Sequence, residues 1–249
     1  MKAMVLAAGL GTRLRPLTDD RPKALVEVCG RTLLEITLAR LREFGIHDVI
    51  INVHHYADMV IDSLKAARNF GMHIEFSRED VLLDTGGGLK KAAWFLGGNS
   101  GAQREEPFIL HNVDVISNID LQRMVEAHKE GNALATLAVQ ERKSSRYLLF
   151  DEQSQLCGRR LVKEEKTEVV RPVQQMTDLA FSGIHVISPR IFPLLTEEGI
   201  FSIVPAYLRL ATLSEKIMAF RADEYYWRDL GKPENILQAE LDIKANFVR

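Results

Sequence analysis

The sequence predicts a layered α/β fold in which helices flank a mixed, mostly parallel sheet. Buried-strand patterns alternate with amphipathic helical patterns through the first half of the chain, and this alternation is typical of parallel strands joined by crossover helices. The chain has 249 residues, of which 46% are hydrophobic, so it is long enough to bury a large core. These observations favour one domain over 1–249, with a less regular second half.

The first half contains the clearest elements. The apolar run 3–8 has the pattern of a strand covered on both faces. Thr32 and Glu35 have capping-box spacing, and apolar residues follow at helical intervals until Gly45, which predicts a helix. The same kinds of pattern predict strands at 49–53, 72–76 and 107–110, a weaker helix over 58–68, and a helix from about 121 to 131.

The second half has fewer helical patterns. Strand patterns occur at 133–139, 146–150 and 179–187, and helix patterns occur at 203–213 and 233–244. Pro233 opens the last of these helices, where its fixed backbone angle suits the first turn. The charged segment 163–166 is expected to be a solvated loop. No internal repeat or low-complexity linker divides the chain.

Charge and cysteine content exclude several classes of protein. The chain has 32 Lys and Arg against 34 Asp and Glu, a net charge of −2, and a pI near 6.4. Proteins that bind nucleic acids or membrane surfaces carry a basic face, so we expect neither partner. Cys29 and Cys157 are too few for a disulfide framework, which fits a cytoplasmic protein. The first apolar run is too short for a signal peptide, and no stretch approaches the roughly 18 apolar residues of a membrane span.

A loop with two glycines, Gly9-Leu10-Gly11-Thr12-Arg13, directly follows the first predicted strand. The carboxyl end of a parallel strand is where such folds bind ligands, and glycines let backbone N–H groups approach phosphate oxygens. A dinucleotide-binding G-x-G-x-x-G would need glycine in place of Leu14, which disfavours a nicotinamide oxidoreductase. A Walker A loop would need a second glycine, Lys and Ser or Thr, and Leu14-Arg15-Pro16 provides none of them.

The longer segment from Leu6 to Thr18, followed by Pro22-Lys23-Ala24-Leu25, resembles the signature of sugar-1-phosphate nucleotidyltransferases. The resemblance implies a Rossmann-like nucleotidyltransferase fold and the transfer of a nucleoside monophosphate (NMP) from a nucleoside triphosphate (NTP) to a sugar 1-phosphate. Arg13 would stabilise the leaving pyrophosphate, and Lys23 would contact phosphate at the reacting centre. The role of Arg15 stays open. The residues that the resemblance assigns to the nucleotide here are Leu6, Ala7, Ala8, Gly9, Gly11, Thr12, Arg13 and Lys23.

A second glycine run, Asp84-Thr85-Gly86-Gly87-Gly88, is similar to the L-x-T-x-G segment of the same family. The similarity implies a loop along the base and ribose, with Thr85, Gly86 and Gly87 binding the nucleotide and Gly88 at the entry of a helix. A flexible turn is the alternative. This version resembles the branch of N-acetylmuramate 1-phosphate uridylyltransferases and mannose-1-phosphate guanylyltransferase homologues. It implies UTP or GTP with an N-acetylmuramate-, glucose- or mannose-type sugar 1-phosphate.

Two aspartates are implied as ligands of Mg²⁺. Asp114 follows the strand at 107–110, and the resemblance assigns it to a catalytic Mg²⁺, which uses one or two carboxylates plus phosphates and water. Asp229 lies in a segment similar to the family's W-x-D-x-G-x-P-E and would reach the same metal, or alternatively only precede the helix at Pro233. The fold must bring the two aspartates together. His111 is expected to be structural, because a sugar phosphate is already an anionic nucleophile.

The sugar side has the weakest signals. Phe181-Ser182-Gly183-Ile184 resembles the strand that lines the sugar pocket of the family, although a core strand with a small-residue packing site is the alternative. We expect a nucleotide-binding half at 1–130 and a sugar-binding half at 131–249, with no C-terminal β-helix extension. A homo-oligomer is compatible with the sequence. The competing function is a catalytically silent, nucleotide-sugar-binding regulatory homologue. The residues expected to bind the sugar phosphate are Asn112, Ser182, Gly183, Asp229 and Gly231.

Overall fold

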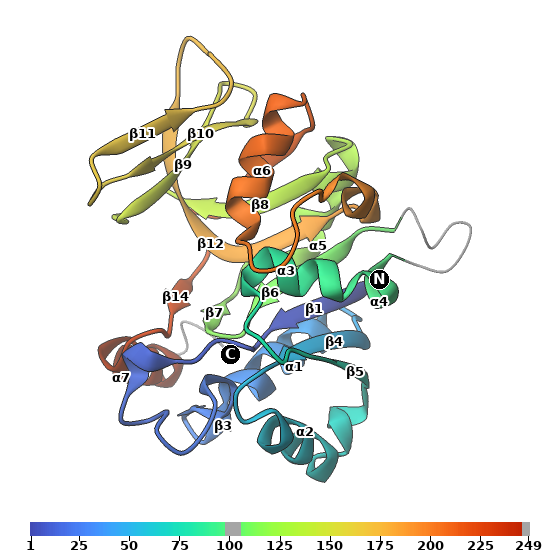
Figure 1. The fold of residues 1–249 in the computed structure, drawn as a ribbon. Coiled ribbons are helices and arrows are strands. Elements are labelled where there is room, and N and C mark those ends of the chain that lie inside the picture. Colours follow the sequence, from blue (N-terminus) through green and yellow to red (C-terminus); the bar gives the residue numbers. More distant parts are fainter. Residues whose placement is uncertain (98–105, 246–249) are drawn as a thin grey trace.

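The computed structural model describes residues 1–97 and 106–245. It contains a ten-stranded mixed sheet with helices on both faces (Figure 1), which confirms the predicted fold class. The helices are α1 (Leu33–Glu43), α2 (Ala57–Ala66), α3 (Asp84–Lys91), α4 (Ala93–Leu96), α5 (Leu121–Glu130), α6 (Ile203–Thr212) and α7 (Pro233–Lys244). The N–H of Glu35 donates to Thr32 Oγ1 at 3.1 Å, so the predicted cap of α1 is confirmed.

A parallel unit of four strands forms the lower part of the sheet in Figure 1. Its strands are β1 (Lys2–Leu6), β4 (Asp48–Val53), β5 (His73–Arg78) and β6 (Phe108–Asn112), in the order β6-β1-β4-β5. The register pairs Leu6 with Asn52 on one side and with Asn112 on the other. Three strands therefore end side by side, and ligands bind at such an edge in α/β sheets.

Antiparallel pairing begins at the long strand β12 (Thr177–Ile187), which pairs with β6, β8 and β9. The remaining strands of this part are β8 (Ala135–Gln140), β9 (Arg146–Phe150), β10 (Leu156–Leu161), β11 (Lys166–Val169) and β13 (Ile217–Arg221). The strands predicted from 133, 146 and 179 are confirmed, whereas β10, β11 and β13 were not predicted. The charged segment 163–166 is largely the exposed turn between β10 and β11, as expected.

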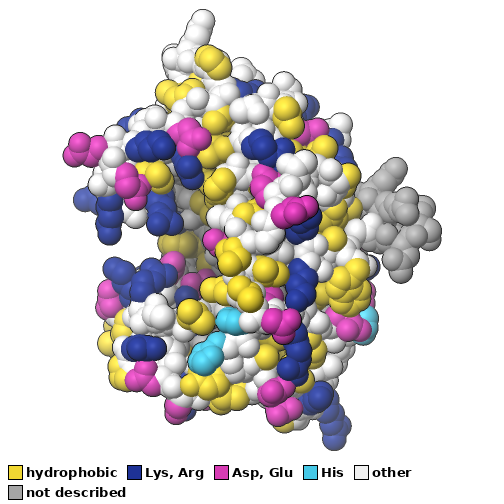
Figure 2. All heavy atoms as spheres, in the orientation of Figure 1, with side chains coloured by type: hydrophobic (Ala, Val, Ile, Leu, Met, Phe, Trp, Pro, Cys, Tyr) yellow, Lys and Arg dark blue, Asp and Glu magenta, His cyan; other side chains and the backbone are white. Residues whose placement is uncertain are grey.

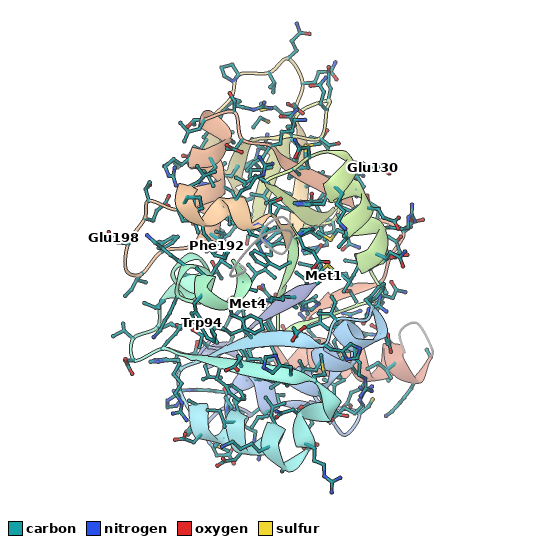
Figure 3. The ribbon with its side chains drawn as sticks, turned by 90° about the vertical axis from the view of Figure 1, so that its right-hand side faces the viewer. Met1, Met4, Trp94, Glu130, Phe192 and Glu198 are labelled. Carbon is teal, nitrogen blue, oxygen red and sulfur yellow. The ribbon has the colours of Figure 1, made fainter. Side chains whose placement is uncertain are left out.

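The two faces of the sheet carry separate hydrophobic clusters. Side chains of successive residues in β1 point to opposite faces, so Val5 joins the cluster covered by α1, α2, α5 and α7, while Met4 joins the cluster covered by α3, α4 and α6. Met4 is labelled in the interior of the molecule in Figure 3. Phe192, labelled nearby, stacks on Phe108 with 5.7 Å between ring centroids and covers the second cluster.

Two short ladders complete the fold. β2 (Glu27–Val28) pairs with β3 (Arg31–Thr32), and β7 (Val115–Ser117) pairs antiparallel with β14 (Trp227–Asp229). The second ladder brings the C-terminal part of the chain back to the carboxyl edge of β6 (Figure 1). Within 1–97 and 106–245, no helix combines the length and the apolar character that crossing a bilayer requires.

Candidate active site

A cavity of about 470 Å³ opens at the carboxyl edge of the parallel strands. Figure 2 shows the molecule hollowed between its upper and lower parts, with Lys and Arg side chains on both sides of the hollow. The cavity joins the end of β1, the ends of β4 and β6, and the start of α3. Its lining residues are Leu6, Ala7, Ala8, Gly9, Lys23, Asn52, Leu82, Asp84, Thr85, Asn112, Val113, Asp114 and Ile200.

The first glycine loop forms one wall of this cavity. The Ala7 N–H donates to Asn52 Oδ1 at 2.7 Å, which fixes the loop to the end of β4. Gly11 has a φ of +65°, and a Cβ there would lie 3.1 Å from the Cβ of Lys23. Gly11 is thus required both by the left-handed backbone and by the close approach of Lys23. Leu14, which stands where a dinucleotide loop needs glycine, is fully buried in the core.

Lys23 and Asp114 meet at the cavity wall. The Lys23 ammonium donates to Asp114 Oδ2, although the two residues are 91 positions apart in the sequence. Only 8% of Lys23 is exposed. The Asp114 carboxylate holds the ammonium group in place at the cavity wall. A compact, partly desolvated ammonium group is suited to bind phosphate oxygens.

The fold also brings the regions of Asp114 and Asp229 together. β7 begins one residue after Asp114, and the ladder pairs Val115 with Asp229. The Leu230 N–H donates to the Asp114 carbonyl oxygen at 2.8 Å. The predicted meeting of these two distant segments is confirmed, whereas a shared metal stays a prediction.

Arg13 lies close to Asp229, with Gly231 packed against both side chains. A Cβ added at Gly231 would lie 2.6 Å from Arg13 Nη2 and 2.6 Å from Asp229 Oδ1. Because the Gly231 N–H also donates to Asp229 Oδ1 at 2.6 Å, this glycine is packed between a cation and an anion. The absence of a side chain at Gly231 makes room for Arg13, and contact of Gly231 with the sugar phosphate stays a prediction.

A buried hydrogen-bond network around Glu79 supports another part of the cavity wall, and no motif indicates it. Glu79 is 4% exposed; it accepts from Asn52 Nδ2 at 2.8 Å and from the Leu83 N–H at 2.9 Å. A Cβ at Gly88 would lie within 2.9 Å of both side chains. The network ties β4 and the start of α3 together, so it positions Asp84 and Thr85 at the cavity.

The second glycine run is a helix and not the expected loop. α3 begins at Asp84 and contains all three glycines. The N–H groups of Gly86 and Gly87 donate to the Phe201 carbonyl oxygen at 2.9 and 3.1 Å, and neither glycine lines the cavity. Their closeness to the 199–201 segment explains why they lack side chains. Direct contact of Gly86 and Gly87 with a base stays a prediction.

The expected sugar strand lies beside the cavity. Gly183 has a φ of +77°, and a Cβ there would lie 2.8 Å from Asn112 Nδ2, so β12 and the end of β6 approach closely. Ser182 is buried, and its hydroxyl has no hydrogen-bond partner among the described residues. Its carbonyl oxygen accepts from Trp227 Nε1 at 2.7 Å. The guanidinium of Arg142, a residue that no motif indicated, lies over the Trp227 ring.

His111 has the structural role that we expected. It is 2% exposed, and its Nδ1 lies 2.8 Å from the Asn112 carbonyl oxygen. Burial lowers the pKa of His111 to about 4, against the opposing effects of that hydrogen bond and of Asp114. The imidazole is therefore neutral near pH 7 and is not the source of positive charge at the site.

The fold is that of the nucleotide-diphospho-sugar transferases. The structure of HddC from Yersinia pseudotuberculosis complexed with GMP-PN aligns with a TM-score of 0.76 over 97% of this chain and 99% of that one, at 23% identity. A UDP-glucose pyrophosphorylase complexed with UDP-glucose aligns with a TM-score of 0.75 over 98% of both chains, at 19% identity.

Sequence comparison then identifies the family. Residues 2–246 match the model of the nucleotidyl transferase family, and the chain belongs to it. An N-acetylmuramate alpha-1-phosphate uridylyltransferase from Caulobacter vibrioides is 34% identical over 96% of this chain and 95% of its own length. A mannose-1-phosphate guanyltransferase from Yarrowia lipolytica is 30% identical over 95% of this chain, which spans 62% of that relative.

Proposed function

We propose that the protein transfers NMP from an NTP to a sugar 1-phosphate and releases pyrophosphate. The observation that carries this proposal is the meeting of Lys23 and Asp114 at the wall of the cavity, beside the β7–β14 ladder. Family membership favours an enzyme over the regulatory alternative. The chain also has all four residues that the resemblance assigns to the reaction, Arg13, Lys23, Asp114 and Asp229.

The reaction brings several anions together and needs positive charge more than a base. A phosphate oxygen of the sugar 1-phosphate attacks the α-phosphorus of the NTP, and the bond from that phosphorus to the pyrophosphate oxygen breaks. Lys23 would neutralise phosphate at the reacting centre, while Arg13 would stabilise the leaving pyrophosphate. Holding both substrates in line supplies much of the remaining acceleration.

The nucleotide would occupy the cavity itself. Residues of the first loop and Thr85 line it, and we assign them to the NTP, with Gly11, Thr12 and Arg13 at the phosphate end. Gly86 and Gly87 would act through α3, whose first residues face the cavity. The nucleotide-binding half would then be 1–130, as the sequence predicts.

The sugar phosphate would lie toward the residues contributed by 131–249. Asn112, Ser182 and Gly183 meet where β6 and β12 approach, and Asp229 with Gly231 stands at the end of β14. We therefore propose that these five residues line the path by which the acceptor reaches the α-phosphorus.

Magnesium is proposed as the cofactor, held by Asp114 and Asp229. The described residues contain no cluster of three or more His, Cys, Asp or Glu that could hold a metal without help. Two carboxylates on neighbouring segments fit Mg²⁺ nonetheless, because this ion commonly takes one or two carboxylates and completes its shell with substrate phosphates and water. When bound, Mg²⁺ would offset the phosphate charge that Arg13 and Lys23 leave uncompensated.

The relatives suggest the substrates. The uridylyltransferase relative is named for N-acetylmuramate 1-phosphate and the guanyltransferase for mannose 1-phosphate, while a relative from Synechocystis is named for UTP and glucose 1-phosphate. We propose UTP or GTP with a sugar 1-phosphate of one of these three types. We also propose a cytoplasmic location and a homo-oligomer.

The test is a matrix of UTP, GTP, dTTP, CTP and ATP against the three sugar 1-phosphates, read as pyrophosphate release and as nucleotide-sugar formation. We expect equal amounts of both products with one pairing, dependent on Mg²⁺. Asp114→Asn should remove this turnover and keep the unfolding transition of the wild type. Nucleotide-sugar binding without turnover for every pair would favour the regulatory alternative, and undiminished turnover in Asp114→Asn would refute the metal assignment.

A further inference from the structure

Arg142 is a half-buried cation whose charge is not paired within the described part of the chain. Its Cζ lies 3.7 Å from the centroid of the Trp227 ring, and its Nη2 donates to the Phe181 carbonyl oxygen at 2.7 Å. Its Nε is buried without a hydrogen-bond partner among the described residues. No carboxylate oxygen of residues 1–97 or 106–245 lies within 4.0 Å of a guanidinium nitrogen of Arg142, the limit for an ion pair.

This cation stands on the sugar side of the proposed site. Trp227 and Asp229 are two residues apart in β14, so their side chains share one face and lie about 7 Å apart along the strand. The indole is held by the Ser182 carbonyl oxygen, next to Gly183, which packs on Asn112. Burial lowers the pKa of Arg142, and the negative charge of Asp229 opposes that shift.

The surroundings of the Arg142 guanidinium favour binding of an anionic ligand over a purely structural role. Stacking on an indole needs only a flat side chain, whereas a buried guanidinium with free donors carries a desolvation cost that an incoming anion would offset. Trp227 covers one face of the guanidinium, so a planar acceptor would approach its edge. A carboxylate matches that edge with two parallel hydrogen bonds.

The ligand group would lie across the sugar ring from the 1-phosphate. The 1-phosphate must reach the α-phosphorus near Lys23 and Asp114, while Arg142 lies over Trp227, two residues along β14 from Asp229. A cation at that position would address a substituent of the acceptor other than its 1-phosphate.

We propose that Arg142 binds a carboxylate carried by the sugar and thereby selects acidic sugar 1-phosphates over neutral ones. This inference rests on the proposed function. It narrows the three sugar types to the N-acetylmuramate type, since glucose and mannose carry no carboxylate. Arg142 would be a specificity residue, with no part in the transfer step.

The test compares two acceptors that differ by one carboxylate-bearing substituent. N-acetylmuramate 1-phosphate carries a lactyl ether that N-acetylglucosamine 1-phosphate lacks. Both kcat/KM for pyrophosphate release and the calorimetric Kd of each sugar phosphate are measured for the wild type, Arg142→Gln, Arg142→Lys and the control Arg146→Gln. Arg146 is exposed at the start of β9, so its change removes the same charge nearby.

We expect the wild type to prefer the acidic sugar. Arg142→Gln should lose about 10- to 100-fold in kcat/KM for the acidic sugar, with a matching rise in its Kd, and about 3-fold or less for the neutral one. Arg142→Lys should fall between, because it keeps the charge without the planar fork, and Arg146→Gln should equal the wild type.

Two results would overturn the inference. An equal loss for both sugars in Arg142→Gln would assign Arg142 to packing on Trp227, and equal use of both sugars by the wild type would remove the selectivity. If no acceptor supports pyrophosphate release with any NTP, the proposed function fails by itself. The two Kd values then test the role of Arg142 separately. Equal affinities of the wild type for the two sugars would reject the inference, and a preference for the acidic sugar that is lost in Arg142→Gln would support it.

Discussion

Replacing Gly231 by alanine should displace Arg13 and leave the fold intact. The new Cβ would lie 2.6 Å from Arg13 Nη2 and 2.6 Å from Asp229 Oδ1, where ordinary contact begins at 3.4 Å. Asp229 is held by the Gly231 N–H, whereas Arg13 is exposed and ends in a flexible side chain. Both side chains must therefore give way, and we expect the larger displacement, of about 1 Å, at the flexible arginine.

The size of the effect follows from that displacement. A misplacement of about 1 Å in a catalytic group costs on the order of 100-fold in rate, so we expect kcat to fall by about that factor. The free energy of unfolding should change by about 1 kcal/mol or less, because Gly231 does not have a positive φ and alanine lowers the entropy of the unfolded chain.

A double-mutant cycle separates this mechanism from general damage. Pyrophosphate release is measured for Gly231→Ala, Arg13→Ala and the double variant, together with urea unfolding of each. If Gly231 acts through Arg13, the alanine at 231 should cost little once Arg13 is absent. Additive losses in kcat, or a loss of more than about 2 kcal/mol in unfolding free energy, would refute the reasoning.

Two further predictions concern stability. Gly183→Ala should cost about 1–3 kcal/mol, because its φ is +77° and the Cβ would lie 2.8 Å from Asn112 Nδ2; a variant as stable as the wild type in urea would contradict this. Burial lowers the pKa of His111 to about 4 and that of His185 to about 3, from 6.5. The unfolded chain therefore binds protons that the folded chain refuses below pH 6.5, and each histidine should remove about 1 kcal/mol of stability per pH unit as the pH falls toward 4. Urea unfolding at pH 7.5 and 5.5 checks the sign, and equal stabilities would count against it.

Local patterns predicted the part of the site that lies next to the strand ends. Continuous apolar runs identify strands buried on both faces, and the loop after β1 is determined by its own residues. The start of α3 was predicted at Gly88 and not at Asp84 because glycines disfavour helices. Hydrogen bonds from Gly86 and Gly87 to the Phe201 carbonyl oxygen, distant in the sequence, override that preference. β13 was missed because its pairing with β8 is a long-range contact.

The site residues that the sequence did not indicate are single residues outside any motif. Glu79 and Arg142 belong to no motif, and their significance comes from burial and from partners far along the chain. A lone Arg or Glu in a sequence is ordinarily a solvated charge, so only the fold distinguishes these two. A motif indicated Gly231, but its closeness to Arg13 could be seen only once the β7–β14 ladder was known.

The central claim is that nucleotidyl transfer occurs where Lys23 and Asp114 meet. The most direct test is the rate of pyrophosphate release by Lys23→Met, compared with the wild type under the pairing of NTP and sugar 1-phosphate that the wild type prefers. Lys65→Met in the exposed part of α2 is the matched control. We predict a loss of about 100- to 1,000-fold for Lys23→Met, with full activity in the control. Wild-type turnover by a folded Lys23→Met protein would contradict the account.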